Sequence, residues 1–270
     1  MKLEILSRKA EGQSPKTPLL FVHGAYVGAW CWEEHFLDWF AARGHPAHAL
    51  SLRGHGASEG HRQLNDFGLA DYAEDVAQAL AELEAAPVLV GHSMGALVVQ
   101  KFLEKGTAPA AVLACPVPAY GLLPSSFTMA WTRPALFAGL NSVANGGRAS
   151  PEVLREALFC GQIGPERLER CYQRMQRESR RALFEMAGWS LPGAMLGWGL
   201  PNVFGGARVP TLVLGAERDS LIAHREAEAS ARLLGAEYRL LAGIGHAIML
   251  DEPWESAAAA ILGWLQEKGL

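Results

Sequence analysis

The stretch PVLVGHSMGALVVQ, residues 87–100, decides how the rest of this sequence is interpreted. An apolar run with the length of a buried strand stops at GHSMG (91–95), and an apolar run of helical length follows it. A turn that only connects two elements rarely needs one serine, Ser93, between two glycines. The pattern predicts a tight strand-to-helix turn that lifts the Ser93 hydroxyl above the edge of a sheet. A glycine-rich turn that happens to contain serine is the alternative interpretation.

Short apolar runs alternate with amphipathic stretches on both sides of this turn. Strands are expected at residues 3–6, 18–22, 45–52, 87–90, 110–115, 210–215 and 236–243. Helices are expected at residues 30–42, 69–83, 96–105 and 223–234 and from residue 253 onward. This alternation predicts an α/β fold with a mostly parallel central sheet of about seven to eight strands and helices on both faces.

The alternation stops between residues 118 and 207, where strand-like runs disappear and helical, glycine-rich and tryptophan-containing segments replace them. We therefore expect a core domain, 1–117 and 208–270, with a helical cap, 118–207, inserted into it. One long helix is expected at 165–186, with five arginines at helical spacing. These arginines are interpreted as a solvated face opposite an apolar stripe. A surface that meets an anionic substrate is the alternative.

Half of the 270 residues are hydrophobic, 19% are charged and the net charge is −4. This composition supports a sizeable buried core and gives no general attraction to nucleic acid. No signal-peptide pattern and no apolar run long enough to span a bilayer occur. The four cysteines form no CxxC pair, and His45 and His48 have no cysteine or acidic partner beside them. We expect a cytoplasmic protein without metal or cofactor. Its oligomeric state stays open.

A serine hydroxyl is a poor nucleophile until a base removes its proton, and the usual base is a histidine oriented by an acid. In this strand–turn–helix context the chain order is Ser, Asp or Glu, His. Of the nine histidines, only His224 and His246 follow the predicted cap. His224 begins a helix among charged residues, whereas His246 lies in a glycine-containing loop at the sheet edge where α/β proteins bind ligands. We predict His246 as the base.

The orienting acid should follow another strand. The loop after strand 210–215 offers Glu217 and Asp219. We favour Asp219 because it lies deeper in the loop, whereas Glu217 can pair with Arg218 in solvent. The strand at 110–115 is followed by no carboxylate, which supports the same choice.

A carbonyl oxygen attacked by such a serine becomes negatively charged and needs hydrogen-bond donors. The segment FVHGA (21–25) ends an early strand and can present the N–H of Ala25. The N–H of Met94 follows the nucleophile directly, at a helix N-terminus. The side chain of His23 is interpreted as structural, so we assign function only to the backbone of this segment.

The chain resembles the α/β-hydrolase superfamily over nearly its whole length, in particular esterase/lipase-like members with a helical cap, such as monoacylglycerol-lipase-like and lysophospholipase-like enzymes. The resemblance rests on PLLFVHG, RGHGAS, GHSMG, GAERD and GIGHAIMLDEP. It implies the triad and the two oxyanion donors at the positions reached above, namely Ser93, Asp219, His246, Ala25 and Met94. Many relatives carry an acid where Ser51 stands, and the N-terminus supplies one strand fewer than the eight-strand pattern.

The resemblance favours a serine hydrolase that cleaves small to medium carboxylic esters through an acyl-enzyme. A cofactor-free perhydrolase (haloperoxidase) or a carbon–carbon bond hydrolase on the same triad stays open, as does a non-hydrolytic ligand-binding protein. Dehalogenases and epoxide hydrolases are disfavoured because they need aspartate at Ser93, and plant-type hydroxynitrile lyases because Ala247 replaces their lysine. Aromatic residues of the cap are expected to line the pocket: Trp131, Phe127, Trp189 and Trp198.

Overall fold

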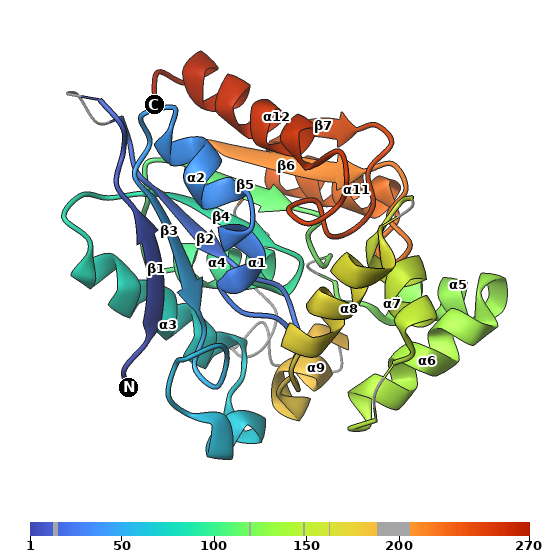
Figure 1. Ribbon diagram of the computed structural model, residues 1–270. Coiled ribbons are helices and arrows are strands. Elements are labelled where there is room, and N and C mark those ends of the chain that lie inside the picture. The colour runs from blue at the N-terminus through green and yellow to red at the C-terminus, as the bar shows by residue number, and fades with distance from the viewer. Residues whose placement is uncertain (13–15, 119, 148, 162, 188–205) are drawn as a thin grey trace.

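The structure, a computed structural model, describes residues 1–12, 16–118, 120–147, 149–161, 163–187 and 206–270. One twisted sheet forms the centre of the molecule, and a group of helices lies at one end of it (Figure 1). The strands are β1 (Glu4–Arg8), β2 (Leu19–Val22), β3 (Ala47–Ser51), β4 (Val88–His92), β5 (Ala111–Ala114), β6 (Thr211–Ala216) and β7 (Glu237–Leu241).

The sheet has the strand order β1-β3-β2-β4-β5-β6-β7. Only β1 runs antiparallel, against β3, and the other neighbours pair in parallel. The carboxyl ends of β2, β4, β5, β6 and β7 therefore meet at one edge of the sheet, where the loops that carry the candidate site begin. The predicted fold class is confirmed, with seven strands in the described residues.

Helices cover both faces of the sheet. One apolar core contains residues of α1 (Trp30–Glu33), α2 (Phe36–Ala41) and α12 (Trp254–Glu267). The other contains residues of α3 (Leu69–Glu82), α4 (Met94–Leu103) and α11 (His224–Leu234). Along β2, Phe21 belongs to the first core and Leu20 and Val22 belong to the second. Buried residues on both faces of one strand explain its continuous apolar run.

The helix expected at 30–42 consists of two pieces, α1 and α2. The break lies at Glu34 and His35, where His35 has φ −141°. The ring of His35 stacks on Trp254, with 4.4 Å between ring centroids. The interruption therefore brings a polar ring into contact with the first turn of α12, which a straight helix pattern could not reveal.

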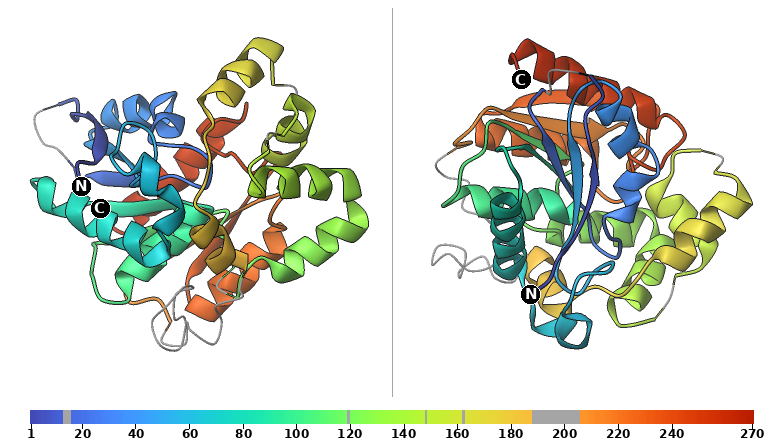
Figure 2. Two further views of the ribbon diagram at one scale, coloured as in Figure 1. Left: turned by 90° about the horizontal axis from the view of Figure 1, so that it is seen from below. Right: turned by 60° about the vertical axis from the view of Figure 1, so that its left-hand side comes forward.

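Between β5 and β6 the described residues form helices and no strand, as the loss of alternation indicated. These helices are α5 (Leu123–Thr132), α6 (Pro134–Ala144), α7 (Pro151–Leu158), α8 (Pro165–Arg174) and α9 (Arg180–Ala187). They form one group beside the sheet in all three views, on the side to which the arrowheads of β5 and β7 point in Figure 1 (Figures 1 and 2).

The single long helix expected at 165–186 is wrong, because the chain leaves the helix after Arg174 and re-enters it at Arg180. Between these points the Gln176 N–H donates to the carbonyl oxygen of Tyr26 (2.9 Å), and the Gln176 side-chain amide donates to the carbonyl oxygen of Gly54 (2.8 Å). A backbone N–H that bonds to the core cannot continue the helical ladder, so the tertiary contacts end α8.

The basic face expected on this region is not wholly solvated. Arg167 is 17% exposed, and its guanidinium lies 2.9 Å from Glu34 and 3.4 Å from Glu252 of the core. Arg174 lies over the ring of Trp30, 4.7 Å from its centroid, but its side chain stays 51% exposed. The expectation is therefore wrong for Arg167, because this part of α8 packs against the core.

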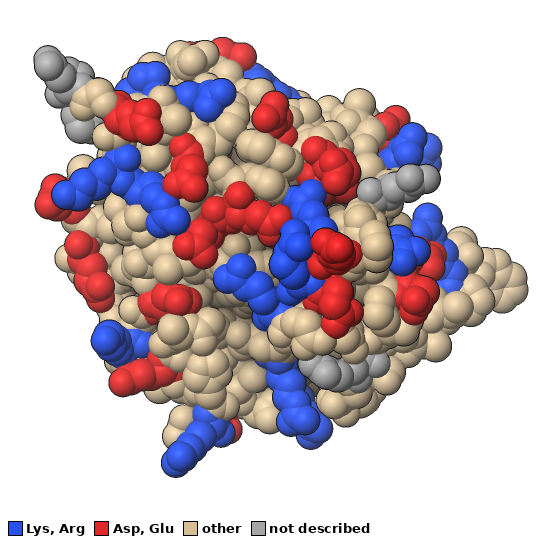
Figure 3. Space-filling model, viewed as in Figure 1, with Lys and Arg blue, Asp and Glu red and all other residues tan. Residues whose placement is uncertain are grey.

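On the face shown in Figure 3, basic and acidic side chains are mixed, and the part over α5 that projects on the right is largely uncharged. Neither sign of charge dominates this surface. None of the helices in the described residues is both long and apolar enough to cross a membrane.

Candidate active site

Ser93 occupies the sharp turn between β4 and α4. Its backbone has φ 53° and ψ −115°, outside the regions that a residue with a side chain usually adopts, at a cost of order 1–3 kcal/mol. The flanking glycines permit this turn. A Cβ atom on Gly91 would lie 2.4 Å from the carbonyl oxygen of Gly95, and one on Gly95 would lie 2.4 Å from that of Val22. The backbone cannot approach so closely with any other residue at these two positions.

His246 and Asp219 meet at the same sheet edge. The Nδ1–H of His246 donates to Asp219 Oδ2 over 2.7 Å, and both side chains are almost fully buried. The other oxygen, Oδ1, accepts the N–H groups of Leu221 and Ile222, each at 2.8 Å. These bonds fix the carboxylate, and the carboxylate in turn fixes the imidazole with its proton on Nδ1. In a neutral ring, Nε2 is then left as an acceptor.

Glu217, the competing acid, lies outside this contact. Its carboxylate accepts the backbone N–H of Gly243 over 2.7 Å in an exposed position. Neither the Ser93 hydroxyl nor His246 Nε2 has a hydrogen-bond partner among the described residues. Catalytic hydrogen bonds are often long in ligand-free proteins and tighten when the substrate binds.

Asp251, a residue to which the sequence analysis assigned no role, holds the loop of His246. Its Oδ2 accepts the N–H of Gly245 (2.7 Å) and the N–H of Cys160 (3.0 Å). The N–H of Ala247 donates to the carbonyl oxygen of Leu158 (2.9 Å). The loop is therefore hydrogen-bonded to the end of α7 and to the residues just after it. The position of Asp251 within GIGHAIMLDEP was the available signal.

The two predicted oxyanion donors follow β2 and begin α4. The Gly24 carbonyl oxygen accepts from His23 Nδ1 over 2.7 Å. Because this carbonyl and the Ala25 N–H belong to one trans peptide, the bond fixes the direction of that N–H. His23 Nε2 accepts the N–H of Leu52 over 3.1 Å. Burial lowers the pKa of His23 to about 3, so the ring is neutral and can donate at one nitrogen and accept at the other.

A second pair, which the sequence analysis missed, lies beside this loop. His55 Nε2 is 3.0 Å from Glu178 Oε2, and both side chains are fully buried. Burial disfavours the charge on His55, but the charge and hydrogen bond of Glu178 outweigh it and raise the pKa of His55. Burial likewise disfavours the charged Glu178, but His55 outweighs it and lowers the pKa of that carboxyl. RGHGAS entered the sequence analysis only as part of the family resemblance, and nothing in the sequence linked it to Glu178.

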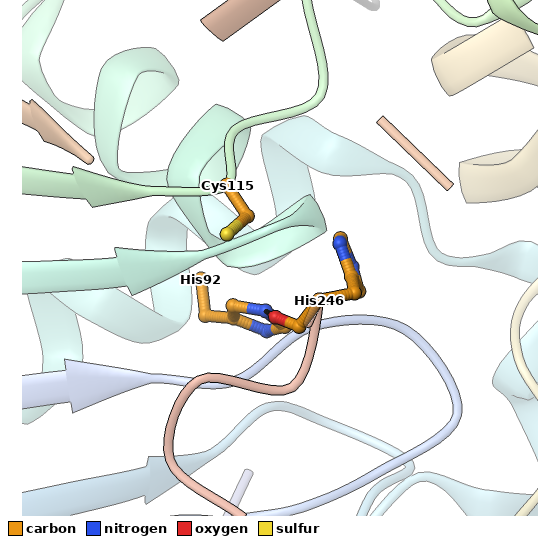
Figure 4. A group of neighbouring side chains, drawn as sticks. All are labelled: His92, Cys115 and His246. Carbon is orange, nitrogen blue, oxygen red and sulfur yellow. Dashed lines mark hydrogen bonds between the residues drawn. The ribbon is translucent and has the colours of Figure 1, made fainter. Parts of the chain in front are cut away.

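His92, Cys115 and His246 each bring one possible metal-ligand atom to within 4.8 Å of the others. Figure 4 shows them at the end of β4, just after β5 and in the loop before α12. His92 Nε2–H donates to the carbonyl oxygen of His246 (2.9 Å). Burial, and then the charge of Asp219, raises the pKa of the Cys115 thiol well above its usual value.

Metals bind the thiolate rather than the thiol. Without a metal, Cys115 is therefore a thiol, buried beneath the candidate site. The absence of a metal stays a prediction.

Two of the four aromatic residues predicted to line a pocket lie in the described part of the chain. The side chains of Phe127 and Trp131, one turn apart on α5, lie at the surface, where these residues are 75% and 90% exposed. Trp189 and Trp198 lie outside the described residues.

Curated relatives match parts of the chain. A probable esterase, PIR7A, from Oryza sativa subsp. indica is 38% identical over 111 residues, 38% of this chain and 40% of the relative. Methyl jasmonate esterase 1 from Vitis vinifera is 34% identical over 89 residues, 32% of this chain and 33% of the relative. The matched part therefore spans two fifths or less of these relatives.

Solved structures match nearly the whole chain. A thermophilic esterase from Thermogutta terrifontis has a TM-score of 0.70 and 22% identity, covering 98% of this chain and 93% of that one. A putative non-heme bromoperoxidase from Mycobacterium tuberculosis has a TM-score of 0.74 and 18% identity, covering 99% and 97%. At these identities the likeness shows the fold.

The family described as the alpha/beta hydrolase family matches residues 19–260. This range includes β2 to β7, the Ser93 turn and the loops of Asp219 and His246. With this match and the sheet order of the fold, the chain belongs to the alpha/beta hydrolase family.

Proposed function

We propose that this protein is a serine hydrolase of small to medium carboxylic esters, with Ser93 as nucleophile, His246 as base and Asp219 as orienting acid. The observation that carries the proposal is that the site combines a nucleophile at a sharp turn, Ser93, with a histidine, His246, whose proton is fixed by an acid. Ser93 is held in a strained turn, and its hydroxyl has no hydrogen-bond partner among the described residues. The buried Asp219 fixes the proton of His246 on Nδ1 over 2.7 Å. The esterases among the partly matching relatives support this reaction class.

In the proposed reaction, Ser93 Oγ attacks the ester carbonyl carbon while its proton passes to His246 Nε2. The carbonyl oxygen takes up the electron pair, and the N–H groups of Ala25 and Met94 stabilise the resulting oxyanion. The carbon–oxygen bond to the alcohol then breaks, and His246 returns the proton to that alcohol. Water then attacks the acyl-enzyme in the same way, with His246 taking its proton. The bond to Ser93 Oγ breaks, His246 returns the proton to Ser93, and the acid is released.

We further propose that residues 118–207 act as the cap that bounds the substrate space. Two contacts between the His246 loop and the segment 158–160, at the end of α7 and just after it, support this role. The Ala247 N–H donates to the Leu158 carbonyl oxygen, and Asp251 accepts the N–H groups of both Cys160 and Gly245. A cap bonded to the loop of the base defines how far a substrate can extend from Ser93. A panel of p-nitrophenyl esters from acetate to laurate would measure that length.

The test is Ser93→Ala. Ester turnover should fall by about 10⁴-fold or more, because removing the nucleophile disables the whole triad. Covalent labelling by a fluorophosphonate should disappear, while the circular dichroism spectrum and melting temperature stay close to those of the wild type. Labelling that persists at another serine would show that the nucleophile is assigned to the wrong residue.

A further inference from the structure

The backbone of Tyr26 is held from both sides by one segment of the cap. Its N–H donates to Glu178 Oε2 over 3.2 Å, and its carbonyl oxygen accepts the N–H of Gln176 over 2.9 Å. Tyr26 has φ 68°, in the left-handed region that a residue with a side chain rarely adopts. Such a conformation persists only where surrounding contacts over-determine it. Here those contacts come from residues 150 or more positions away along the chain.

Tyr26 directly follows Ala25, the proposed oxyanion donor. The Ala25 N–H lies one peptide before the Tyr26 N–H, so the dihedral angles of Ala25 alone separate the held peptide from the donor. The Ala25 N–H is therefore held on one side by the His23 bond to the Gly24 carbonyl oxygen and on the other, through the dihedral angles of Ala25, by the Tyr26 peptide. Loss of the cap contact would release the second of these and let a donor that must lie within hydrogen-bond distance of the oxyanion change direction.

The carboxylate of Glu178 is itself held by donors only. Oε1 accepts the Tyr72 hydroxyl (2.9 Å) and the Ser179 N–H (2.7 Å). Oε2 accepts from His55 (3.0 Å) as well as from Tyr26. Four donors around one buried carboxylate fix its orientation. The Tyr26 N–H is therefore bonded to a rigid acceptor rather than to a mobile side chain.

The neighbouring residue of the segment strengthens the same junction. The Gln176 side chain donates to the carbonyl oxygen of Gly54 (2.8 Å) and accepts the N–H of Gly56 (2.9 Å). Residues 176–178 thus bind both the loop after β2 and the RGHG loop. This is the segment in which the helix pattern of the cap is broken.

We propose that Glu178 is a positioning residue for the oxyanion hole, through which the seating of the cap sets the direction of the Ala25 N–H. The inference rests on the proposed function, because it assumes that Ala25 serves an oxyanion on the Ser93 acyl centre. Glu178 does not touch the reacting atoms and acts only through Tyr26. Loss of the Glu178 contact alone would leave the triad intact and the oxyanion hole incomplete.

The experiment compares Glu178→Gln and Glu178→Ala with a matched control, Glu185→Gln. Glu185 is also a buried cap carboxylate that accepts a core N–H, that of Leu69 at 2.8 Å, but it has no contact with Tyr26. Loss of a whole oxyanion donor costs about 10²–10³-fold in kcat, so a misdirected donor should cost roughly 10–100-fold. We expect this loss in kcat for Glu178→Ala with KM nearly unchanged.

Glu178→Gln retains one oxygen that can accept from Tyr26 and should recover part of the loss. Glu185→Gln should keep wild-type kcat. A trifluoromethyl ketone, which adds to Ser93 and places an oxyanion in the same hole, should bind Glu178→Ala more weakly by the same factor as kcat/KM. Wild-type kcat and ketone affinity in both Glu178 variants would overturn the proposal, even if their melting temperatures fall.

Hydrogen exchange of the Tyr26 amide, followed by NMR, separates this proposal from the proposed function. Exchange should accelerate in both Glu178 variants. If Glu178→Ala folds poorly, Glu178→Gln still gives the measurement, because it conserves the shape of the side chain. It should stay slow in Glu185→Gln. A wild-type protein without turnover or fluorophosphonate labelling would contradict the hydrolase assignment alone. Unchanged Tyr26 exchange in Glu178→Gln and Glu178→Ala would contradict the positioning role whatever the activity.

Discussion

Two buried histidine–carboxylate pairs lie near the same sheet edge and differ in one respect. His246 bonds to Asp219 through Nδ1 alone, and its Nε2 has no partner in the described part of the chain. His55 uses both ring nitrogens, Nε2 toward Glu178 (3.0 Å) and Nδ1 toward the carbonyl oxygen of Arg53 (3.1 Å). Both neighbours of His55 are acceptors, so a protonated ring satisfies both bonds.

The comparison separates reactivity from burial. A histidine with both nitrogens bonded to acceptors has no site left for a proton from another group, whereas one with a single fixed nitrogen keeps a site at the other. Closeness to a carboxylate therefore does not identify a base. The pair His55–Glu178, in which both ring nitrogens are bonded (the saturated pair), joins residues 176–178 to the core. The pair His246–Asp219, in which one ring nitrogen is left (the unsaturated pair), acts on Ser93 in the proposed reaction.

The largest effect should come from the unsaturated pair. Asp219→Asn should lower kcat by about 10⁴-fold, because an amide can stabilise the wrong tautomer of the imidazole. Glu217→Gln, the matched control in the same loop, should retain most activity because, among the described residues, its carboxylate bonds to nothing but an exposed backbone N–H. Steady-state kinetics on a p-nitrophenyl ester measures both. Equal losses in the two variants would remove the distinction between these acids.

The saturated pair should instead dominate stability. His55→Ala leaves Glu178 as a buried charge without its partner, which costs about 3–5 kcal/mol in the free energy of unfolding. Urea denaturation of the variant and of the wild type gives the difference. A change below about 1 kcal/mol would mean that water or Tyr72 compensates the carboxylate, and the pair would not anchor the cap.

The pH dependence of stability should show the same pair. The pKa of Glu178 is lowered on folding, so its contribution is complete above the usual value of about 4.5 and is lost as pH falls through the folded pKa. The pKa of His55 is raised, so its contribution is complete below about 6.5 and is lost as pH rises through the folded pKa. The stability difference between wild type and His55→Ala should therefore be largest between about pH 4.5 and 6.5.

Measuring unfolding free energies of both proteins from pH 4 to pH 9 tests this window. A difference that grows steadily toward pH 9 would mean that His55 is neutral in the folded protein. Other titratable or charged groups face the pair and are present in both proteins, so their contributions largely cancel in the difference: His23, Arg53, Tyr72 and Asp75.

The smallest effect should come from a charge beside the pair. Arg177 precedes Glu178, is exposed and forms no ion pair within the described residues. Arg177→Gln should change the free energy of unfolding by no more than about 0.5 kcal/mol and leave kcat unchanged. A larger loss in either urea denaturation or kinetics would show that charge in this segment, rather than the buried pair, controls the cap.

The sequence alone determined the fold class and the position of the serine turn. The period of the apolar residues distinguishes strands from helices within a few residues of sequence. The glycines at 91 and 95 indicate positions where the backbone leaves no room for a side chain. It also pointed to His246 and Asp219, because parallel strands bring their carboxyl ends to one edge. All of these follow from a few consecutive residues or from the regular alternation of strands and helices in a parallel sheet.

The tertiary structure alone decided the end of α8 and the pairing of His55 with Glu178. These two residues are 123 positions apart, and each has an ordinary local context in the sequence. The helix pattern at 165–186 was continuous, but Gln176 bonds to Tyr26 and Gly54 of the core instead of to its own helix. Contacts between distant segments outweigh local helical preference where buried polar groups must find partners, and the sequence carries no local record of that requirement.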